Sequence, residues 1–269
     1  MLPLDFFTEL LPKLFNVEVF YNVPLRTVHI TEQSAHSMNF PTAPSAVELA
    51  EFLLVLDPGH GGSDTGCQGA SGVLEKNVVL DLAKRIRALC LQNGMRIQLT
   101  RELDVERRPI ERIRIANRNR GQLFLSLHCN ASFSPNAAGI RIYINNPMGE
   151  FRSEAALPAP NHTSGRSSIK ILTQDDYLLQ SREFAAVLKD QFAAIFPTSP
   201  ISQSEMPLVT LSGVYMPAIL VEIGYLSNAD DADRLDDDES LASASMAVFL
   251  AVQRFSSALE SDKAAVKEN

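Results

Sequence analysis

The stretch FLLVLDPGHGGSDTGCQGASGVLE, residues 52–75, decides the fold of this chain. Its first five residues, 52–56, form an apolar run that is too short for a typical helix, and the Asp-Pro-Gly sequence that follows is a turn signal. The pattern predicts a buried strand that ends in a turn. His60 follows in a glycine-rich loop, and Glu75 begins the next helix. This order can bring a nitrogen ligand and an oxygen ligand to one point above a sheet.

Strand and helix patterns alternate along the chain after this stretch. Helices are predicted at 75–93, 109–117, 181–196 and 239–258, where apolar residues recur at helical spacing. Further strands are predicted at 95–100, 123–127, 139–144 and within 217–228. The alternation predicts the α/β class: a single domain with a mixed, mostly parallel sheet of about six strands, flanked by helices on both faces.

Two local expectations accompany this fold. On the helix predicted at 109–117, Ile110, Ile113 and Ala116 are expected to face inward. The acidic runs ADDAD and DDDE, at 229–233 and 236–239, are expected to form a solvated turn and the negatively charged start of the last helix.

The chain divides into three parts by composition. Residues 1–50 are predicted to be an N-terminal appendage made of an amphipathic helix over 4–15, short strands interrupted at Pro24, and a linker rich in Ser, Pro, Ala and Thr. Residues 51–260 form the predicted α/β domain. Residues 261–269 are predicted to be a disordered tail.

Composition and charge exclude several classes of function. The net charge of −8 argues against general affinity for nucleic acid or for an anionic membrane. No stretch approaches the roughly 20 apolar residues that cross a bilayer, and the first residues lack the basic start and apolar run of a signal peptide. The three cysteines, Cys67, Cys90 and Cys129, have no CxxC spacing and are expected to be reduced thiols without a metal role.

His60, Glu75 and His128 are candidate metal ligands. Catalytic zinc prefers three protein ligands of nitrogen, sulfur or oxygen type and leaves one position for water. His128 follows the predicted strand at 123–127, as His60 follows its own strand. Each residue also has an ordinary explanation, because a histidine can cap backbone groups and a helix start favours a glutamate.

Glu222 is harder to explain by structure alone. It lies between Val221 and Ile223 in the last predicted strand. An unpaired carboxylate in apolar surroundings costs several kcal/mol or becomes protonated. A metal ion, or water bound to one, would account for it.

Six segments, in order along the chain, resemble the successive motifs of the zinc-dependent N-acetylmuramoyl-L-alanine amidases, the bacterial cell-wall hydrolases of the amidase type 3 family. They cover about 52–255, and only 145–205 lacks a clear match. The segments are LDPGHGGSDTG, GVLEKNVVLDLA, LTRELD, ERIRIAN, LFLSLHCNAS and MPAILVEIGYLSN.

This resemblance implies that His60, Glu75 and His128 hold Zn²⁺ and that Glu222 is the catalytic carboxylate. The implied reaction is hydrolysis of the amide between N-acetylmuramic acid and the L-alanine of the peptidoglycan stem peptide. Peptidoglycan is then the substrate partner, and the expected location is the cell envelope, periplasmic or extracellular, although no signal peptide is expected in this chain.

Weaker roles attach to other motif residues. Asp57 and Asp64 are expected either to orient the loop and a metal-bound histidine or to cap turns. Lys76, Arg101, Arg112 and Asn117 match motif positions and serve either structural hydrogen bonds or substrate contact. Asn130 and Ser132 follow the second histidine and are expected to line the substrate groove.

Some members of the resembled family carry a helical insertion that covers the zinc until a partner protein displaces it. Here the corresponding segment, about 145–180, contains Pro, Ser and Gly and has little helical periodicity. We therefore expect an enzyme that this segment does not inhibit. An upstream domain or an activator protein remains a possible partner.

Two alternatives stay open at this point. A zinc amidase or peptidase with the same site would act on soluble muropeptides or other peptides. An inactive homologue would bind or regulate murein, but the presence of all four residues, His60, Glu75, His128 and Glu222, argues against it.

Overall fold

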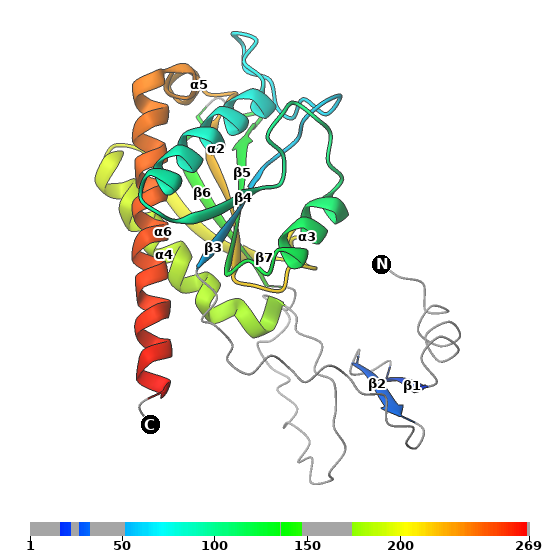
Figure 1. Cartoon of the computed structure of the whole chain (residues 1–269). Helices are drawn as coiled ribbons and strands as arrows, with labels where there is room; N and C mark the ends of the chain where they lie inside the picture. The colour runs from blue at the N-terminus through cyan, green and yellow to red at the C-terminus, as the bar shows by residue number, and fades with distance from the viewer. Residues whose placement is uncertain (1–16, 23–26, 33–51, 135, 147–173, 268–269) are drawn as a thin grey trace, which may run out of the picture. The chain divides into compact units, whose positions relative to one another are not determined.

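The computed structural model describes residues 17–22, 27–32, 52–134, 136–146 and 174–267 (Figure 1). The chain forms two units, one comprising 1–50 and 155–172 and the other comprising 51–154 and 173–269. Each unit is described by itself. The domain limits expected from the sequence stay predictions. Most of the segment about 145–180, which we expected not to inhibit the enzyme, lies outside the described residues, at 147–173.

The first unit contains a two-stranded antiparallel sheet. β1, Val17–Asn22, pairs with β2, Thr27–Glu32, so that Val17 faces Glu32 across the pair. Both strands are rich in β-branched and aromatic residues, and Pro24 falls in their connection, as the pattern of short interrupted strands predicted. The amphipathic helix expected over 4–15 lies outside the described residues.

The second unit is built on a six-stranded sheet in the order β4-β3-β5-β8-β6-β7. Neighbouring strands are parallel except for the antiparallel pair β6–β8. The strands are β3 (Leu53–Pro58), β4 (Arg96–Leu99), β5 (Leu123–Asn130), β6 (Ile140–Asn145), β7 (Ile201–Met206) and β8 (Ala218–Tyr225). The predicted mixed, mostly parallel α/β sheet is confirmed.

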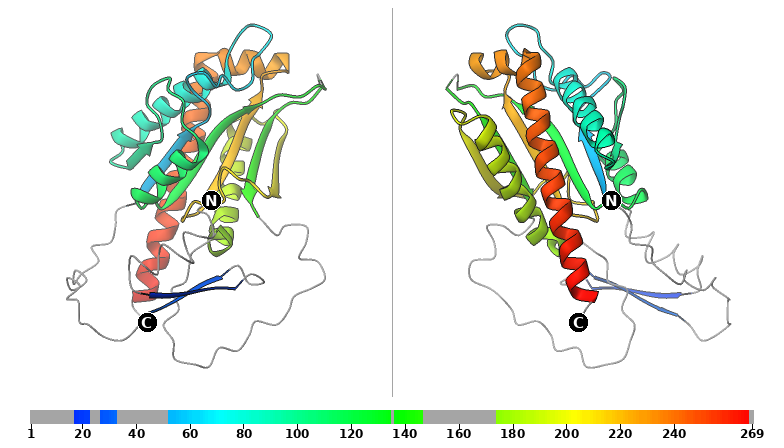
Figure 2. Two further views of the ribbon diagram at one scale, coloured as in Figure 1. Left: turned by 90° about the vertical axis from the view of Figure 1, so that its right-hand side faces the viewer. Right: turned by 60° about the vertical axis from the view of Figure 1, so that its left-hand side comes forward.

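Helices cover both faces of this sheet. α2 (Glu75–Gln92), α4 (Leu178–Ile195) and α6 (Asp238–Lys267) pack on one face (Figure 2). α3 (Pro109–Arg118) and the loop 208–216 cover part of the other face. A 3-10 turn, η2 (Gln174–Tyr177), and a short helix, α5 (Ala229–Asp236), complete the unit. No helix of the described residues is long and apolar enough to cross a membrane.

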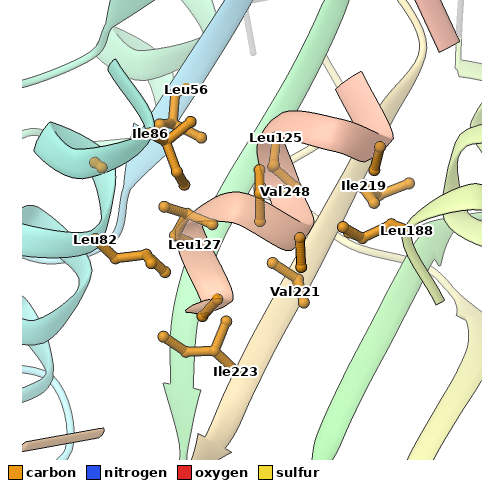
Figure 3. Packing of buried hydrophobic residues seen from close by; sticks show 14 of the residues in the cluster. Leu56, Leu82, Ile86, Leu125, Leu127, Leu188, Ile219, Val221, Ile223 and Val248 are labelled. Carbon is orange, nitrogen blue, oxygen red and sulfur yellow. The ribbon is translucent and has the colours of Figure 1, made fainter. Parts of the chain in front are cut away.

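The main core lies between the sheet and the face of α2, α4 and α6. Strands buried on both faces read as continuous apolar runs, which is why β3 begins with LLVL and β5 begins with LFL. Figure 3 shows side chains of the three helices meeting those of the central strands. The labelled residues of this core are Leu56, Leu82, Ile86, Leu125, Leu127, Leu188, Ile219, Val221, Ile223 and Val248.

The structure corrects the expected solvated turn at 229–233, which instead forms the first part of α5. The side chain of Asn228 caps this helix by accepting a hydrogen bond from the backbone N–H of Asp231, at 3.1 Å. Leu235 is buried at its inner face. The acidic residues therefore lie where the helix dipole favours them.

Two further elements differ from expectation. α6 continues to Lys267, beyond the predicted end near 258 and into the expected tail, because this segment contains strong helix formers and neither Gly nor Pro. β7 was not predicted, because ISQSEM lacks the apolar residues by which strands are recognised.

Candidate metal centre and catalytic carboxylate

The three expected metal ligands meet at the carboxyl end of the sheet, although they come from separate elements. His60 lies in the loop after β3, Glu75 is the first residue of α2, and His128 lies near the end of β5. Their ligand atoms all lie within 4.8 Å of one another. The Oε1 atom of Glu75 is 3.0 Å from Nε2 of His60 and 2.9 Å from Nδ1 of His128. The two imidazole rings are nearly perpendicular, at 83°.

His60 is fixed by its backbone and by a carboxylate. Its φ of 56° lies in the left-handed region, which residues other than glycine seldom adopt. Arg112 donates a hydrogen bond to the His60 carbonyl at 2.6 Å. On the ring, Nδ1 is 2.8 Å from Oδ1 of Asp64, so Nε2 is left to face the centre. Oδ1 of Asp64 also accepts a hydrogen bond from the Gly66 N–H at 3.1 Å, so Asp64 makes both kinds of contact that the sequence left open, one to the histidine ring and one within the turn.

Glu75 is almost completely buried, with 1% of its surface exposed. Two backbone N–H groups hold its carboxylate: Cys67 donates to Oε2 at 2.9 Å, and Cys129 donates to Oε1 at 3.0 Å. Although burial raises the pKa of Glu75, its hydrogen bonds with His128 and His60 hold that pKa well below the usual range. The Glu75 hydrogen bond in turn raises the pKa of His60, against the opposing effect of burial.

Two glycines provide the space for these side chains. A β-carbon at Gly59 would lie 2.4 Å from Cε1 of His128, because the imidazole packs directly over this residue. A β-carbon at Gly66 would lie 2.5 Å from Oε2 of Glu75. The glycines of the loop thus allow the ligands to approach the backbone closely.

Glu222 lies in β8, directly across from His128 in the parallel β5–β8 pair. Residues in register on neighbouring strands project from the same face of the sheet. Its Oε2 atom is buried and has no hydrogen-bond partner in the structure. Burial raises the pKa of Glu222 to about 7, Glu75 adds to this rise, and His128 and His60 oppose it.

Asp57 has a different role from the metal ligands. It is buried in β3, and its carboxylate accepts hydrogen bonds from Arg112 and Ser126, both at 2.8 Å, and from Thr100. The side chain therefore anchors the strand end from which the His60 loop departs, and among the described residues no hydrogen bond or ion pair joins it to the three candidate ligands.

Arg101 and Arg112 brace the same loop. Arg101 is 2% exposed and donates to the carbonyls of Pro58 and Gly59. Arg112 binds the Pro58 carbonyl as well as Asp57. Because Arg112 takes the inner position on α3, Ile110 is 41% exposed, and the expectation that Ile110 faces inward is wrong. Ile113 and Ala116 are buried as expected.

Asn117 and Asn130 make hydrogen bonds to groups other than the three candidate ligands. Asn117 donates to the Gly213 carbonyl at 2.8 Å and accepts from the Tyr215 N–H at 2.9 Å, so it ties α3 to the loop 208–216. Asn130, at the end of β5, accepts from the next backbone N–H with its side chain.

Lys76 and Ser132 contact segments that are distant in the sequence. Lys76 donates to the carbonyl of Gly62 at 2.8 Å and forms an ion pair with Asp104 at 2.7 Å. Asp104 also accepts from the Gly62 N–H. The backbone N–H of Ser132 donates to the hydroxyl of Ser227 at 2.9 Å. The Lys76–Asp104 contact with the glycine loop could not be read from the sequence, because the two residues are far apart in it.

A hollow of about 640 Å³ lies away from the centre, between the end of β4, the following loop and α3. None of the four residues of the centre lines it, and we assign the chemistry to the converging side chains rather than to this hollow. Its charged lining residues are Arg101, Glu102, Arg107, Arg114 and Arg118.

Comparisons with known proteins identify the family of this chain. The family model described as N-acetylmuramoyl-L-alanine amidase matches residues 54–254. The amidase AmiA of Escherichia coli K12 is 30% identical over 194 residues, which cover 66% of this chain and 67% of that protein. AmiA of Salmonella typhimurium is 28% identical over 216 residues, which cover 74% and 75% of the two chains.

Solved structures show the same fold. AmiC2 of Nostoc punctiforme superposes with a TM-score of 0.61 at 27% identity and covers 76% of this chain and 96% of its own. The CwlD amidase of Clostridioides difficile, solved in complex with the GerS lipoprotein, has a TM-score of 0.61 at 20% identity and covers 77% of this chain and all of its own. The family match, the relatives and the fold all agree with the six motifs, and the chain belongs to the N-acetylmuramoyl-L-alanine amidase family, whose enzymes hydrolyse the amide bond between N-acetylmuramic acid and L-alanine in peptidoglycan.

Proposed function

We propose that His60, Glu75 and His128 hold a zinc ion in this amidase and that Glu222 is its catalytic carboxylate. One observation carries the second part: the buried Oε2 of Glu222 has no hydrogen-bond partner, although the residue lies directly across from His128. Buried polar atoms are nearly always hydrogen-bonded, and an exception calls for an explanation, such as a catalytic role or a bound ion or water.

The residues present fit a zinc ion. Two imidazole nitrogens and one carboxylate oxygen form one of the ligand sets of catalytic zinc sites, and such sites leave a position for water. Asp64 binds the far nitrogen of His60, as carboxylates do behind zinc-bound histidines. Two backbone N–H groups hold the Glu75 carboxylate beside the two imidazole rings.

A zinc ion at these ligands would polarise the scissile carbonyl and lower the pKa of a water molecule toward neutrality. Glu222 would accept the proton of the attacking water and deliver it to the leaving amine of L-alanine. A carboxyl group with a pKa of about 7 suits both steps, because it exchanges protons readily near neutral pH.

The location follows from the substrate. Enzymes of this family act on the cell wall, and we propose that this chain acts in the bacterial envelope. Within the substrate class, intact sacculi and small soluble muropeptides are the two alternatives, and comparing the rates on both would separate wall hydrolysis from muropeptide cleavage.

The decisive experiment incubates the purified chain with intact peptidoglycan, with and without a chelator, and then with zinc restored. Mass spectrometry of the products identifies the new ends. We expect stem peptides with free L-alanine amino termini, which disappear with chelator and return with zinc. Cleavage at another bond would overturn the substrate assignment, and chelator-resistant cleavage would overturn the metal assignment.

A further inference from the structure

A row of polar side chains continues from the metal centre across the sheet. Glu222 in β8 is paired on one side with His128 of β5 and on the other side with Arg141 of β6. Arg141 is paired in turn with Ser202 of β7. Because paired residues project from the same face, His128, Glu222, Arg141 and Ser202 form one line across four strands.

Arg141 is held in this line by neutral groups. Its Nε donates to the hydroxyl of Tyr225 at 2.6 Å, and its Nη1 donates to the hydroxyl of Ser202 at 3.0 Å. The guanidinium carbon also lies 5.8 Å from the centre of the Tyr225 ring. These contacts fix the position of the guanidinium group and leave its positive charge without a carboxylate.

The remaining donors of Arg141 are unused. A guanidinium has five N–H donors, and two of them make the hydrogen bonds described above. Among the residues that the structure describes, Arg141 forms no ion pair, and Oε2 of Glu222 across the strand pair makes no hydrogen bond. A partly buried arginine with free N–H donors and no ion-pair partner can bind an anion from outside the protein, because guanidinium groups bind carboxylates in a bidentate manner.

The proposed mechanism indicates which part of the substrate reaches Arg141. If Glu222 delivers a proton to the leaving amine, the stem peptide must pass Glu222. Neighbouring strands are about 4.8 Å apart, and an extended peptide advances about 3.3 Å per residue. Arg141 therefore lies one to two residues beyond the scissile bond, on the side of Glu222 that faces away from His128.

We propose that Arg141 binds a carboxylate of the stem peptide directly after L-alanine and is a specificity-determining residue of this amidase. The inference rests on the proposed function, and it names the substrate class more narrowly: stem peptides whose second residue has a free carboxylate, in preference to stems in which this group is a carboxamide.

The test uses two soluble muropeptides that differ only in a carboxylate or a carboxamide on the second stem residue. We expect the wild-type enzyme with zinc to prefer the carboxylate form in kcat/KM by about 10- to 100-fold, as charge-assisted hydrogen bonds contribute. In Arg141→Gln we expect the ratio of the two kcat/KM values to fall to near unity. Only the kcat/KM for the carboxylate form should decrease, mainly because its KM rises. Arg141→Lys retains part of the preference.

Arg118→Gln is the matched control, because Arg118 is an exposed arginine on α3 and its loss leaves the preference unchanged. Equal wild-type rates on both muropeptides would overturn the inference and leave the amidase assignment intact. An equal loss on both substrates in Arg141→Gln would also overturn it, since that is the result of a purely structural role.

A binding measurement keeps the inference testable without turnover. Calorimetry compares the affinity of the free stem peptide, in both forms, for wild type and Arg141→Gln. We expect the wild type alone to prefer the carboxylate form. If neither muropeptide is cleaved, the proposed function fails, and the peptide affinities still decide the role of Arg141.

Discussion

Asp57 and Glu222 are two acidic side chains on the same face of one sheet, and their surroundings are opposite. Asp57, in β3, accepts hydrogen bonds from an arginine and two hydroxyl groups. Glu222, two strands away in β8, has a buried oxygen atom without any partner. The comparison separates two uses of a buried acid. A carboxylate with hydrogen bonds to both oxygens stabilises the fold, and one with an unpaired oxygen is available for the proposed proton transfer.

The same distinction applies to the arginines on this face. Arg112 is bound to Asp57 and to backbone carbonyls of the His60 loop, so its donors serve the structure. Within the part of the chain that the structure describes, Arg141 donates hydrogen bonds to two hydroxyl groups and keeps three donors. This face of the sheet thus has two pairs of an acid and an arginine. Asp57 and Arg112 bind each other, and among the described residues Glu222 and Arg141 form no ion pair.

Glu222→Gln gives the largest effect and tests the reactive side of the comparison. We expect activity on peptidoglycan to fall by about 10²- to 10⁴-fold, because an amide cannot accept and deliver the proton. Zinc content and the free energy of unfolding stay close to those of the wild type. Activity assays, metal analysis and chemical denaturation measure the three quantities, and near-normal turnover with zinc bound would remove Glu222 from the mechanism.

Asp57→Ala tests the structural side. Removing one partner of a buried ion pair leaves Arg112 charged and unpaired, and we expect the free energy of unfolding to fall by about 3–5 kcal/mol. Denaturant titration measures the change. The control is Glu102→Ala, which breaks the exposed pair with Arg87 and costs about 0–1 kcal/mol. Equal losses in both variants would contradict the assigned role of Asp57.

Asp64→Ala sharpens the comparison at the metal ligands. Because Asp64 orients His60 without supporting the core, we expect zinc affinity to fall by about 10- to 100-fold while the metal-free protein keeps its stability. Competition with a zinc chelator measures the affinity. Asp81→Ala, in an exposed pair with Arg85 on α2, is the control and leaves zinc binding unchanged. Wild-type affinity in Asp64→Ala would exclude this orienting role.

Asn117→Ala gives the smallest effect. The variant loses two hydrogen bonds between α3 and the loop 208–216, and we expect the free energy of unfolding to fall by about 1–2 kcal/mol without loss of kcat. Thermal and chemical denaturation provide the readout. Asn119→Ala, which removes only a bond within α3, is the control. A marked loss of kcat in Asn117→Ala, at unchanged stability, would place Asn117 with the substrate instead.

The sequence predicted the parts of the molecule that depend on local order. Each histidine directly follows an apolar strand and Glu75 begins a helix, so a parallel sheet brings them to one edge. Elements without an apolar pattern were not predictable in this way. β7 is polar because it is an edge strand, and α5 depends on a cap and one buried leucine rather than on composition.

The roles of the arginines needed the structure, because they depend on contacts between distant segments. Arg112 and Ile110 are two residues apart on one helix, and only the position of Asp57 in β3 decides that the arginine turns inward. Arg141 is next to Glu222 only through the antiparallel pairing of β6 with β8. The order of the strands along the chain does not determine that pairing.

The close packing of His128 over Gly59 also constrains how this sequence can change. Any β-carbon at position 59 would collide with the imidazole, so a single substitution there displaces His128. The effects of changes at two residues in contact are not additive, and a larger side chain at 59 is acceptable only together with a rearrangement at 128. Positions 59 and 128 are therefore expected to change together. An engineered or diverged variant that loses Gly59 is expected to have lost the geometry of His128 as well.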